Sequence, residues 1–219
     1  MTTATTEAPS TEAVALQWPY RMSYETYEQI ADLAMIRPEE HVVLLDGILV
    51  QTMTKGPQHH NSVDRGAEVF RAALPRGWSV RSEGPLVLRT GPAGDSAPEP
   101  DLAVVLGARD RYEDRHPEAH EVGLIVEVAT SPASFAADRI GLRRYAHAGV
   151  SGVWIVSLHD RTVHLFTDPS GPALEPGYAH VEVERPGELL EVMLPSPTPD
   201  QPASILGPIA VASFFPPTL

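Results

Sequence analysis

The most apolar segment of the chain reads Gly123-Leu-Ile-Val-Glu-Val-Ala129. Its near-continuous run of Leu, Ile and Val predicts a β-strand that is buried on both faces. One residue interrupts the run, because Glu127 stands between two valines. A carboxylate in such a strand is costly to bury unless a partner or a metal ion compensates its charge. The segment therefore predicts the centre of a sheet and a residue that demands a partner.

A second carboxylate, Asp101, opens another apolar segment. It follows Pro100 and precedes a predicted strand over residues 102–106. If the two strands are neighbours, the carboxylates of Asp101 and Glu127 converge. Together with a backbone carbonyl such as that of Val128, they would form an oxygen site suited to Mg²⁺ or Mn²⁺. The alternative is that Asp101 caps its strand and Glu127 pairs with an arginine in the core.

Helix and strand signals surround these two segments. Ser23 is a predicted N-cap of a helix that ends before Pro38. Asp46-Gly47 predicts a hairpin turn between strands at residues 42–45 and 48–52. Apolar periodicity predicts further helices over residues 59–74 and 134–148. The remaining predicted strands lie at residues 78–80, 86–88, 153–157, 162–166, 179–183 and 189–193.

This order of elements predicts an α/β or α+β fold. We expect a mixed β-sheet flanked by helices, with an N-terminal helix and β-hairpin and a C-terminal β-meander. Residues 1–19 lack periodicity and residues 195–219 are rich in proline, so both are expected to be tails. The folded domain is accordingly expected to span residues 20–194.

Composition excludes several classes of protein. The chain has no cysteine, which excludes disulfides, thiolate metal sites and a cysteine nucleophile. It has no long apolar run, so we expect a cytoplasmic protein that does not span a membrane. Its net charge of −13 provides no global attraction to a nucleic-acid backbone. Among its 16 basic residues the only lysine is Lys55.

Several motifs in a fixed order resemble the Uma2 family of restriction-endonuclease-like proteins, within the PD-(D/E)XK phosphodiesterase superfamily. The resemblance covers about residues 20–185 and implies a restriction-endonuclease-like mixed sheet. It is carried by Leu45-Asp-Gly47, Met53-Thr-Lys-Gly-Pro-Gln-His-His60, Pro98-Glu-Pro-Asp101, Leu124-Ile-Val-Glu127, Asp138-Arg139, and Tyr145-Ala-His-Ala-Gly-Val150 followed by Val153-Trp-Ile-Val156.

The resemblance implies metal-dependent hydrolysis of phosphodiester bonds in DNA. Asp101 and Glu127 would bind Mg²⁺ or Mn²⁺, with the carbonyl of Val128 as a third ligand. Families of this kind complete the site with a lysine, either two residues after the glutamate or on the following helix, four residues before the tyrosine. The residues at those two places are Ala129 and Gly141.

Two interpretations follow from the missing lysine. In one, the protein is an endonuclease in which an arginine, Arg144 or Arg143, takes the place of the lysine, although an arginine is a poor general base. In the other, it is a catalytically inactive nuclease-fold protein with a binding or regulatory role. By analogy with small nucleases of this kind, a homodimer is expected.

The start of the second predicted helix carries two adjacent histidines. Their side chains point about 100° apart, so only one can face the site. We expect this to be His60, which would position a water molecule or a phosphate oxygen; the alternative is a local hydrogen bond. Two further acids lie near the predicted sheet edge: Glu83 is a candidate for the acidic cluster, and Asp46 is a turn residue.

Overall fold

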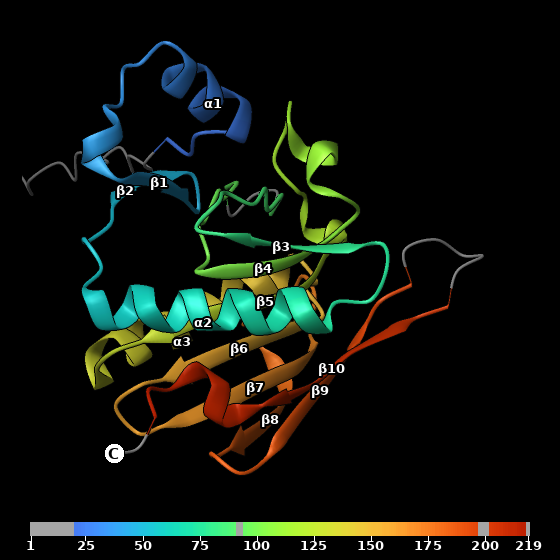
Figure 1. The fold of residues 1–219 in the computed structure, drawn as a ribbon. Coiled ribbons are helices and arrows are strands. Elements are labelled where there is room, and N and C mark those ends of the chain that lie inside the picture. The colour runs from blue at the N-terminus through green and yellow to red at the C-terminus, as the bar shows by residue number, and fades with distance from the viewer. Residues whose placement is uncertain (1–19, 91–93, 197–201, 218–219) are drawn as a thin grey trace, which may run out of the picture.

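A six-stranded mixed β-sheet forms the centre of the structure, a computed structural model that describes residues 20–90, 94–196 and 202–217 (Figure 1). The strands lie in the order β3-β4-β5-β6-β7-β8, and only β5 and β6 are parallel. Helix α3 is the crossover that a parallel pair requires. The mixed architecture predicted from the sequence is confirmed. The elements are β3 (Trp78–Ser82), β4 (Leu102–Leu106), β5 (Val122–Ala129), α3 (Pro132–His147), β6 (Gly152–Ser157), β7 (Thr162–Pro169) and β8 (Tyr178–Glu184).

Helices α2 (Pro57–Ala73) and α3 pack on opposite faces of this sheet. Strand β5 shows the alternation that such a double layer requires. Leu124 and Val126 belong to the core beneath α2, whereas Ile125 and Ala129 belong to the core beneath α3. By the same alternation Glu127 faces α3. This strand therefore holds the glutamate in the layer between the sheet and α3.

Helix α2 begins where the sequence provides a start signal, with Pro57 in its first turn after the N-cap Gly56. Its buried residues recur at helical spacing and include His59, Val63 and Phe70. His59 thus belongs to the face of α2 that packs on the sheet. The phase of this helix decides which of the two histidines reaches the site.

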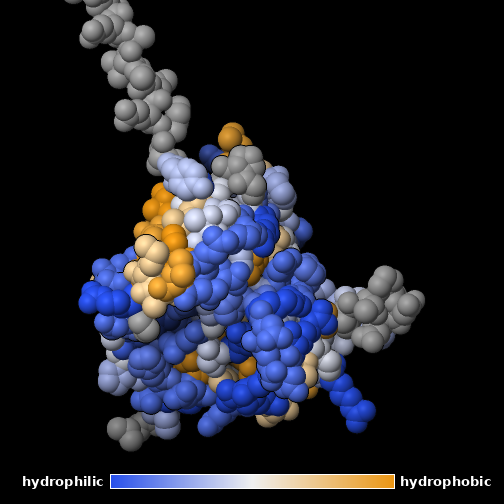
Figure 2. All heavy atoms as spheres, turned by 90° about the horizontal axis from the view of Figure 1, so that it is seen from above, coloured by the Kyte–Doolittle hydropathy of each residue, from blue (hydrophilic) through white to orange (hydrophobic). Residues whose placement is uncertain are grey.

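The N-terminal part adds a small layer above the β3 edge of the sheet (Figure 1). It consists of α1 (Tyr24–Asp32), the 3-10 turn η1 (Pro38–Glu40) and a hairpin of β1 (Val42–Leu45) and β2 (Ile48–Gln51). The predicted turn is confirmed: Asp46 and Gly47 have φ values of 51° and 73°, as a two-residue hairpin turn requires. Seen from above, this side of the molecule is mostly hydrophilic, with a larger apolar patch at the upper left and smaller ones elsewhere (Figure 2).

The C-terminal part differs from the expectation. Strand β9 (Leu189–Leu194) does not continue the meander but pairs with β10 (Ser204–Ala210) in a separate two-stranded sheet. Residues 195–219 were expected to form a tail, yet Leu206 and Phe214 are completely buried, the latter in the turn η5 (Val211–Phe214). The sequence did not predict this strand because proline is tolerated in strands mainly at edges and bulges. Pro208 lies at such an irregularity, where the β9–β10 register shifts.

Other expectations have different outcomes. Residues 86–88 form isolated bridges instead of a strand, although Leu86 and Leu88 are buried. The expected tail over residues 1–19 lies outside the described residues. Two further 3-10 turns, η3 (Arg109–Tyr112) and η4 (Ala119–Glu121), precede β5. None of the helices in the described ranges combines the length and apolar character needed to cross a bilayer.

Candidate active site

The two predicted carboxylates lie side by side in the sheet. Strands β4 and β5 are antiparallel with Leu102 opposite Val126, so Asp101 comes to lie opposite Glu127. The backbone N–H of Asp101 donates to Oε2 of Glu127 at 3.3 Å, and the backbone N–H of Val128 donates to Oδ2 of Asp101 at 2.6 Å. The side chain of Asp101 is only 3% exposed. The sheet register therefore creates a buried acid pair.

A lysine contacts this pair from a part of the chain that was not predicted to contribute to the site. Lys55 lies in the loop between β2 and α2, and its Nζ donates to Oδ1 of Asp101. The same Nζ lies 3.9 Å from Oε1 of Glu83, so that glutamate does join the acidic cluster. The only lysine of the chain thus contacts the acid pair, although neither of the two expected positions, 129 and 141, carries one.

The structure does not bring Arg144 to the acid pair, contrary to the expectation. Its Nη2 donates to Oδ2 of Asp46 at 2.8 Å, which gives that turn residue a second role. The reason is helical phase: Tyr145 points toward Glu127, and the preceding residue of α3 is rotated by about 100°. Among the described residues, Lys55 and not an arginine of α3 contacts Asp101.

The histidine that contacts Asp101 is His59 and not His60. His59 is buried, and its Nε2 lies 2.9 Å from Oδ2 of Asp101. His60 is exposed, and its Nε2 lies 3.1 Å from the backbone oxygen of Lys55. A local hydrogen bond, the alternative role for His60, is therefore the one observed. The sequence contains a signal for this, because His59 stands four residues before the buried Val63.

Helix α3 contributes two groups, Asp138 and Tyr145, which lie in the motifs that carry the Uma2 resemblance but were not predicted to be site residues. The hydroxyl of Tyr145 donates to Oε1 of Glu127 at 2.8 Å. Asp138, seven residues earlier on the helix, is close enough for its charge to act on Glu127. These residues lie on one face of α3, together with Gly141 between them. The repeat at 138, 141 and 145 would have identified this face.

The pKa values of the buried acids are shifted in opposite directions. Burial opposes the charge of Asp101, but the hydrogen bond from His59 and the charge of Lys55 outweigh it and lower the pKa of Asp101. Burial raises the pKa of Glu127 well above its ordinary value, and the charges of Asp101 and Asp138 raise it further. Burial, reinforced by the charge of Asp101, raises the pKa of Asp138 to about 6.

Lys55 carries the positive charge that these acids share. Desolvation opposes protonation of its amine, but the charges of Asp101, Glu127 and Glu83 together raise its pKa. The charge of this one ammonium group acts on four acids: Asp101, Glu127, Glu83 and Asp138. Repulsion among the acids raises the pKa of Glu127 and of Asp138, and a further cation would relieve that repulsion.

The donor atoms at the acid pair fit a small divalent cation. In a strand the N–H and C=O of one residue point to the same edge, so the carbonyl of Val128 lies on the edge where its N–H meets Asp101. Two carboxylates and a carbonyl make an all-oxygen set, which suits Mg²⁺ and Mn²⁺.

A second group of ligand atoms adjoins the acid pair. His59, His60 and Glu83 each bring one ligand atom to within 4.8 Å of the others. Its two imidazoles suit Zn²⁺ and similar metals better than Mg²⁺. The acid pair is therefore the better site for a hard cation.

Comparison with known proteins identifies the family. The Uma2 family model, described as "Putative restriction endonuclease", matches residues 24–199. The chain belongs to the Uma2 family. The motifs that suggested Uma2 from the sequence lie within this range and include Asp101, Glu127 and Tyr145. No curated protein matches the chain significantly in sequence.

A solved structure agrees with this assignment at the level of the fold. The chain is similar to a crystal structure from Anabaena variabilis, described as that of a "putative nuclease belonging to DUF820". The TM-score is 0.56 at 14% sequence identity, and the similarity covers 88% of this chain and 97% of the other. The two chains thus share a fold over most of their lengths.

Proposed function

We propose that this Uma2 protein is a metal-dependent endonuclease that hydrolyses phosphodiester bonds in DNA. Asp101 and Glu127 would bind Mg²⁺ or Mn²⁺ together with the carbonyl of Val128. The observation that carries the proposal is the contact of Lys55 with Asp101. A restriction-endonuclease-like site needs a lysine beside its acids, and the one lysine of this chain stands there.

Each residue of the site would have a distinct task. When bound, the ion would lower the pKa of a coordinated water and neutralise charge on the phosphate. Lys55, as an ammonium group, would hold a phosphate oxygen or orient the attacking water. His59 fixes the orientation of Asp101 through Oδ2, and Tyr145 fixes that of Glu127 through Oε1. Pre-positioning of this kind lowers the cost of assembling the reacting groups.

One observation favours a second candidate, a nuclease-fold protein that binds a partner without cleaving it. Lys55 binds Oδ1 of Asp101, the same carboxylate that a metal ion requires, so the amine and the ion compete. The net charge of −13 also opposes approach to DNA. In this case the lysine replaces the metal ion and stabilises the fold.

Cleavage of labelled single- and double-stranded DNA tests the proposal. The wild type, Asp101→Asn and the control Asp110→Asn are compared with Mg²⁺, with Mn²⁺ and with chelator. Asp110 is an exposed acid in η3 and is remote from the acid pair in the fold. We expect cleavage by the wild type and the control, abolished by chelator and by Asp101→Asn. Absence of cleavage under both metals, from protein with a cooperative unfolding transition, would overturn the nuclease and support the second candidate.

A further inference from the structure

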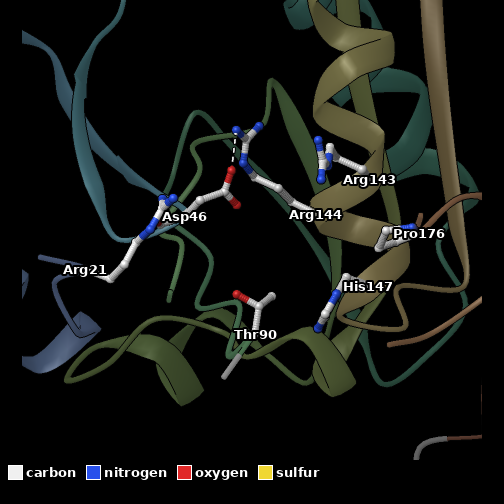
Figure 3. A pocket seen from close by; sticks show the side chains of 7 residues that line it. All are labelled: Arg21, Asp46, Thr90, Arg143, Arg144, His147 and Pro176. Atoms are coloured by element: carbon white, nitrogen blue, oxygen red, sulfur yellow. Dashed lines mark hydrogen bonds and ion pairs between the residues drawn. The ribbon is translucent and has the colours of Figure 1, made fainter. Parts of the chain in front are cut away.

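A basic cavity lies between α3 and the N-terminal hairpin. Its volume is about 280 Å³. Arg143, Arg144 and His147 of α3 line one side, while Arg21 and Asp46 line the other (Figure 3). Thr90 lies at a third side of the opening (Figure 3). In a chain with a net charge of −13, the three arginines around this cavity form a local concentration of positive charge.

The cavity has more positive charge than its own residues neutralise. Its single carboxylate, that of Asp46, is paired with Arg144, and Arg21 donates to the backbone oxygen of Asp46. Within the described ranges, Arg143 and His147 have no hydrogen-bond or ion-pair partner. With His147 neutral, three arginines face one acid, an excess of two positive charges.

The donors also point to a specific type of ligand. Nε of Arg144 is buried and has no hydrogen-bond partner among the described residues. A guanidinium group presents parallel N–H donors that match the oxygens of a phosphate. Ligand pockets typically begin at about 300 Å³, so this cavity can hold a phosphate group and the atoms next to it but not a large organic molecule.

The position of the cavity identifies the source of the phosphate. Arg144 and Tyr145 are adjacent on α3, and Tyr145 binds Glu127 of the acid pair. Adjacent helix residues are rotated by about 100°, so the cavity and the acid pair lie on neighbouring faces of one helix. A DNA strand presents a phosphate about every 3.4 Å along the duplex axis. A strand held at the acid pair would therefore bring another of its phosphates to the cavity.

We propose that this cavity binds a backbone phosphate of the DNA strand and thereby positions that strand at the acid pair. The proposal rests on the proposed function for its ligand, but binding can be measured without cleavage. Arg143 and His147 would provide the contacts to the phosphate, because their side chains form no hydrogen bond or ion pair with another described residue. Arg144 would contribute Nε while it remains paired with Asp46.

The test measures DNA binding by the full chain in chelator, where no metal-dependent cleavage can occur. Fluorescence anisotropy of a labelled oligonucleotide is compared for the wild type, the double variant Arg143→Ala with His147→Ala, and the control Arg76→Ala. Arg76 is an exposed arginine outside the cavity. Neither cavity substitution removes a partner from a described residue, so the fold should be retained, and thermal unfolding checks this.

The expected result has two parts. The double variant binds about tenfold more weakly, since a lost charge-assisted hydrogen bond is worth about that factor. Its plot of log affinity against log salt concentration also becomes shallower by about 0.7 to 0.9, the value for one lost phosphate contact. Arg76→Ala changes neither quantity. Equal binding and equal salt dependence in the double variant and the control would overturn the proposal.

Two further measurements distinguish a site for a DNA strand from a pocket for free phosphate. Titration with inorganic phosphate, followed by calorimetry, detects a pocket for the small free ion. Binding of inorganic phosphate that depends on Arg143, without any effect of the variant on DNA, would overturn the assignment to a DNA strand. Asp101→Asn is expected to bind DNA with the same dependence on Arg143. This result would support the cavity even if the wild type cleaved no DNA, so the two proposals can fail separately.

Discussion

Moving the only lysine of the chain from residue 55 to residue 141 tests whether the amine or its position in the sequence matters. Lys55 contacts Asp101 from a loop, whereas the Uma2 resemblance implies a lysine on the helix, at the position of Gly141. Gly141 stands four residues before Tyr145, whose hydroxyl reaches Glu127. A lysine at residue 141 would therefore extend from the same face of α3 toward the acid pair.

The structure sets the size of each effect. A Cβ added at Gly141 meets no atom within 4 Å, so Gly141→Lys introduces no clash. Replacing a glycine inside a helix by a straight-chain residue stabilises it by about 0.5–1 kcal/mol, or about 2–4 °C in Tm at the upper end. Lys55→Ala removes a partner of the buried Asp101. Because the amine itself is partly exposed to solvent, we expect the free energy of unfolding to fall by only about 1–2 kcal/mol.

The effect on cleavage is larger than the effect on stability. Loss of one positioned donor to a developing negative charge typically lowers kcat by about 10²–10³. We expect a decrease of that size in Lys55→Ala, and a recovery of at least about tenfold when Gly141→Lys is added. The assay is the rate of cleavage of a labelled DNA duplex at saturating Mg²⁺ or Mn²⁺, with Tm measured for each variant. Full activity in Lys55→Ala, or a folded double variant no faster than the single one, would refute the assigned role of Lys55.

Three further predictions concern the rest of the fold and site. His59→Asn should lower kcat for DNA cleavage at least about tenfold more than His60→Asn, because only His59 orients Asp101; equal effects would contradict this. Phe214→Ala should lower the free energy of unfolding, measured in urea, by about 3–5 kcal/mol, since the ring is completely buried. A loss below about 1 kcal/mol would contradict the packing of residues 204–215 in the core. Hydrogen bonds led by that from Arg115 lower the pKa of Glu121 from 4.5 to about 2. Because the folded pKa is depressed, this stabilisation is complete above about pH 4.5 and is lost as the pH falls toward 2. Glu121→Gln should therefore cost about 1–2 kcal/mol at pH 7, after allowance for the exposed arginines, and progressively less in acid; a pH-independent difference would contradict the assignment.

The acid pair was predictable because its signal is local. Asp101 precedes one apolar strand and Glu127 interrupts another, and strand register then determines that they meet. The choice between His59 and His60 needed only the phase of α2, which the spacing to Val63 contains. The prediction of His60 was wrong although the sequence carried the information that decides it.

The contact of Lys55 with the acids was not predictable in the same way. Its loop connects the hairpin to α2, and the path of that loop depends on how the N-terminal layer packs on the sheet. No periodicity encodes such a path. Strand β10 was missed for a related reason, because the prolines of residues 195–219 suggest a tail until the partner strand β9 is known.

The packing of the C-terminal segment on α2 links the site to the order of protein synthesis. Ser62, three residues after His59, donates to the backbone oxygen of Phe214 at 2.9 Å, across 152 residues of sequence. A Cβ on Gly66 would lie 3.1 Å from the ring of Phe214, so the helix and this segment are in close contact. The helix that carries His59 cannot reach its final packing until residue 214 has left the ribosome. The packing of the helix that carries His59 is therefore completed only by a segment that lies 152 residues beyond Ser62 in the chain.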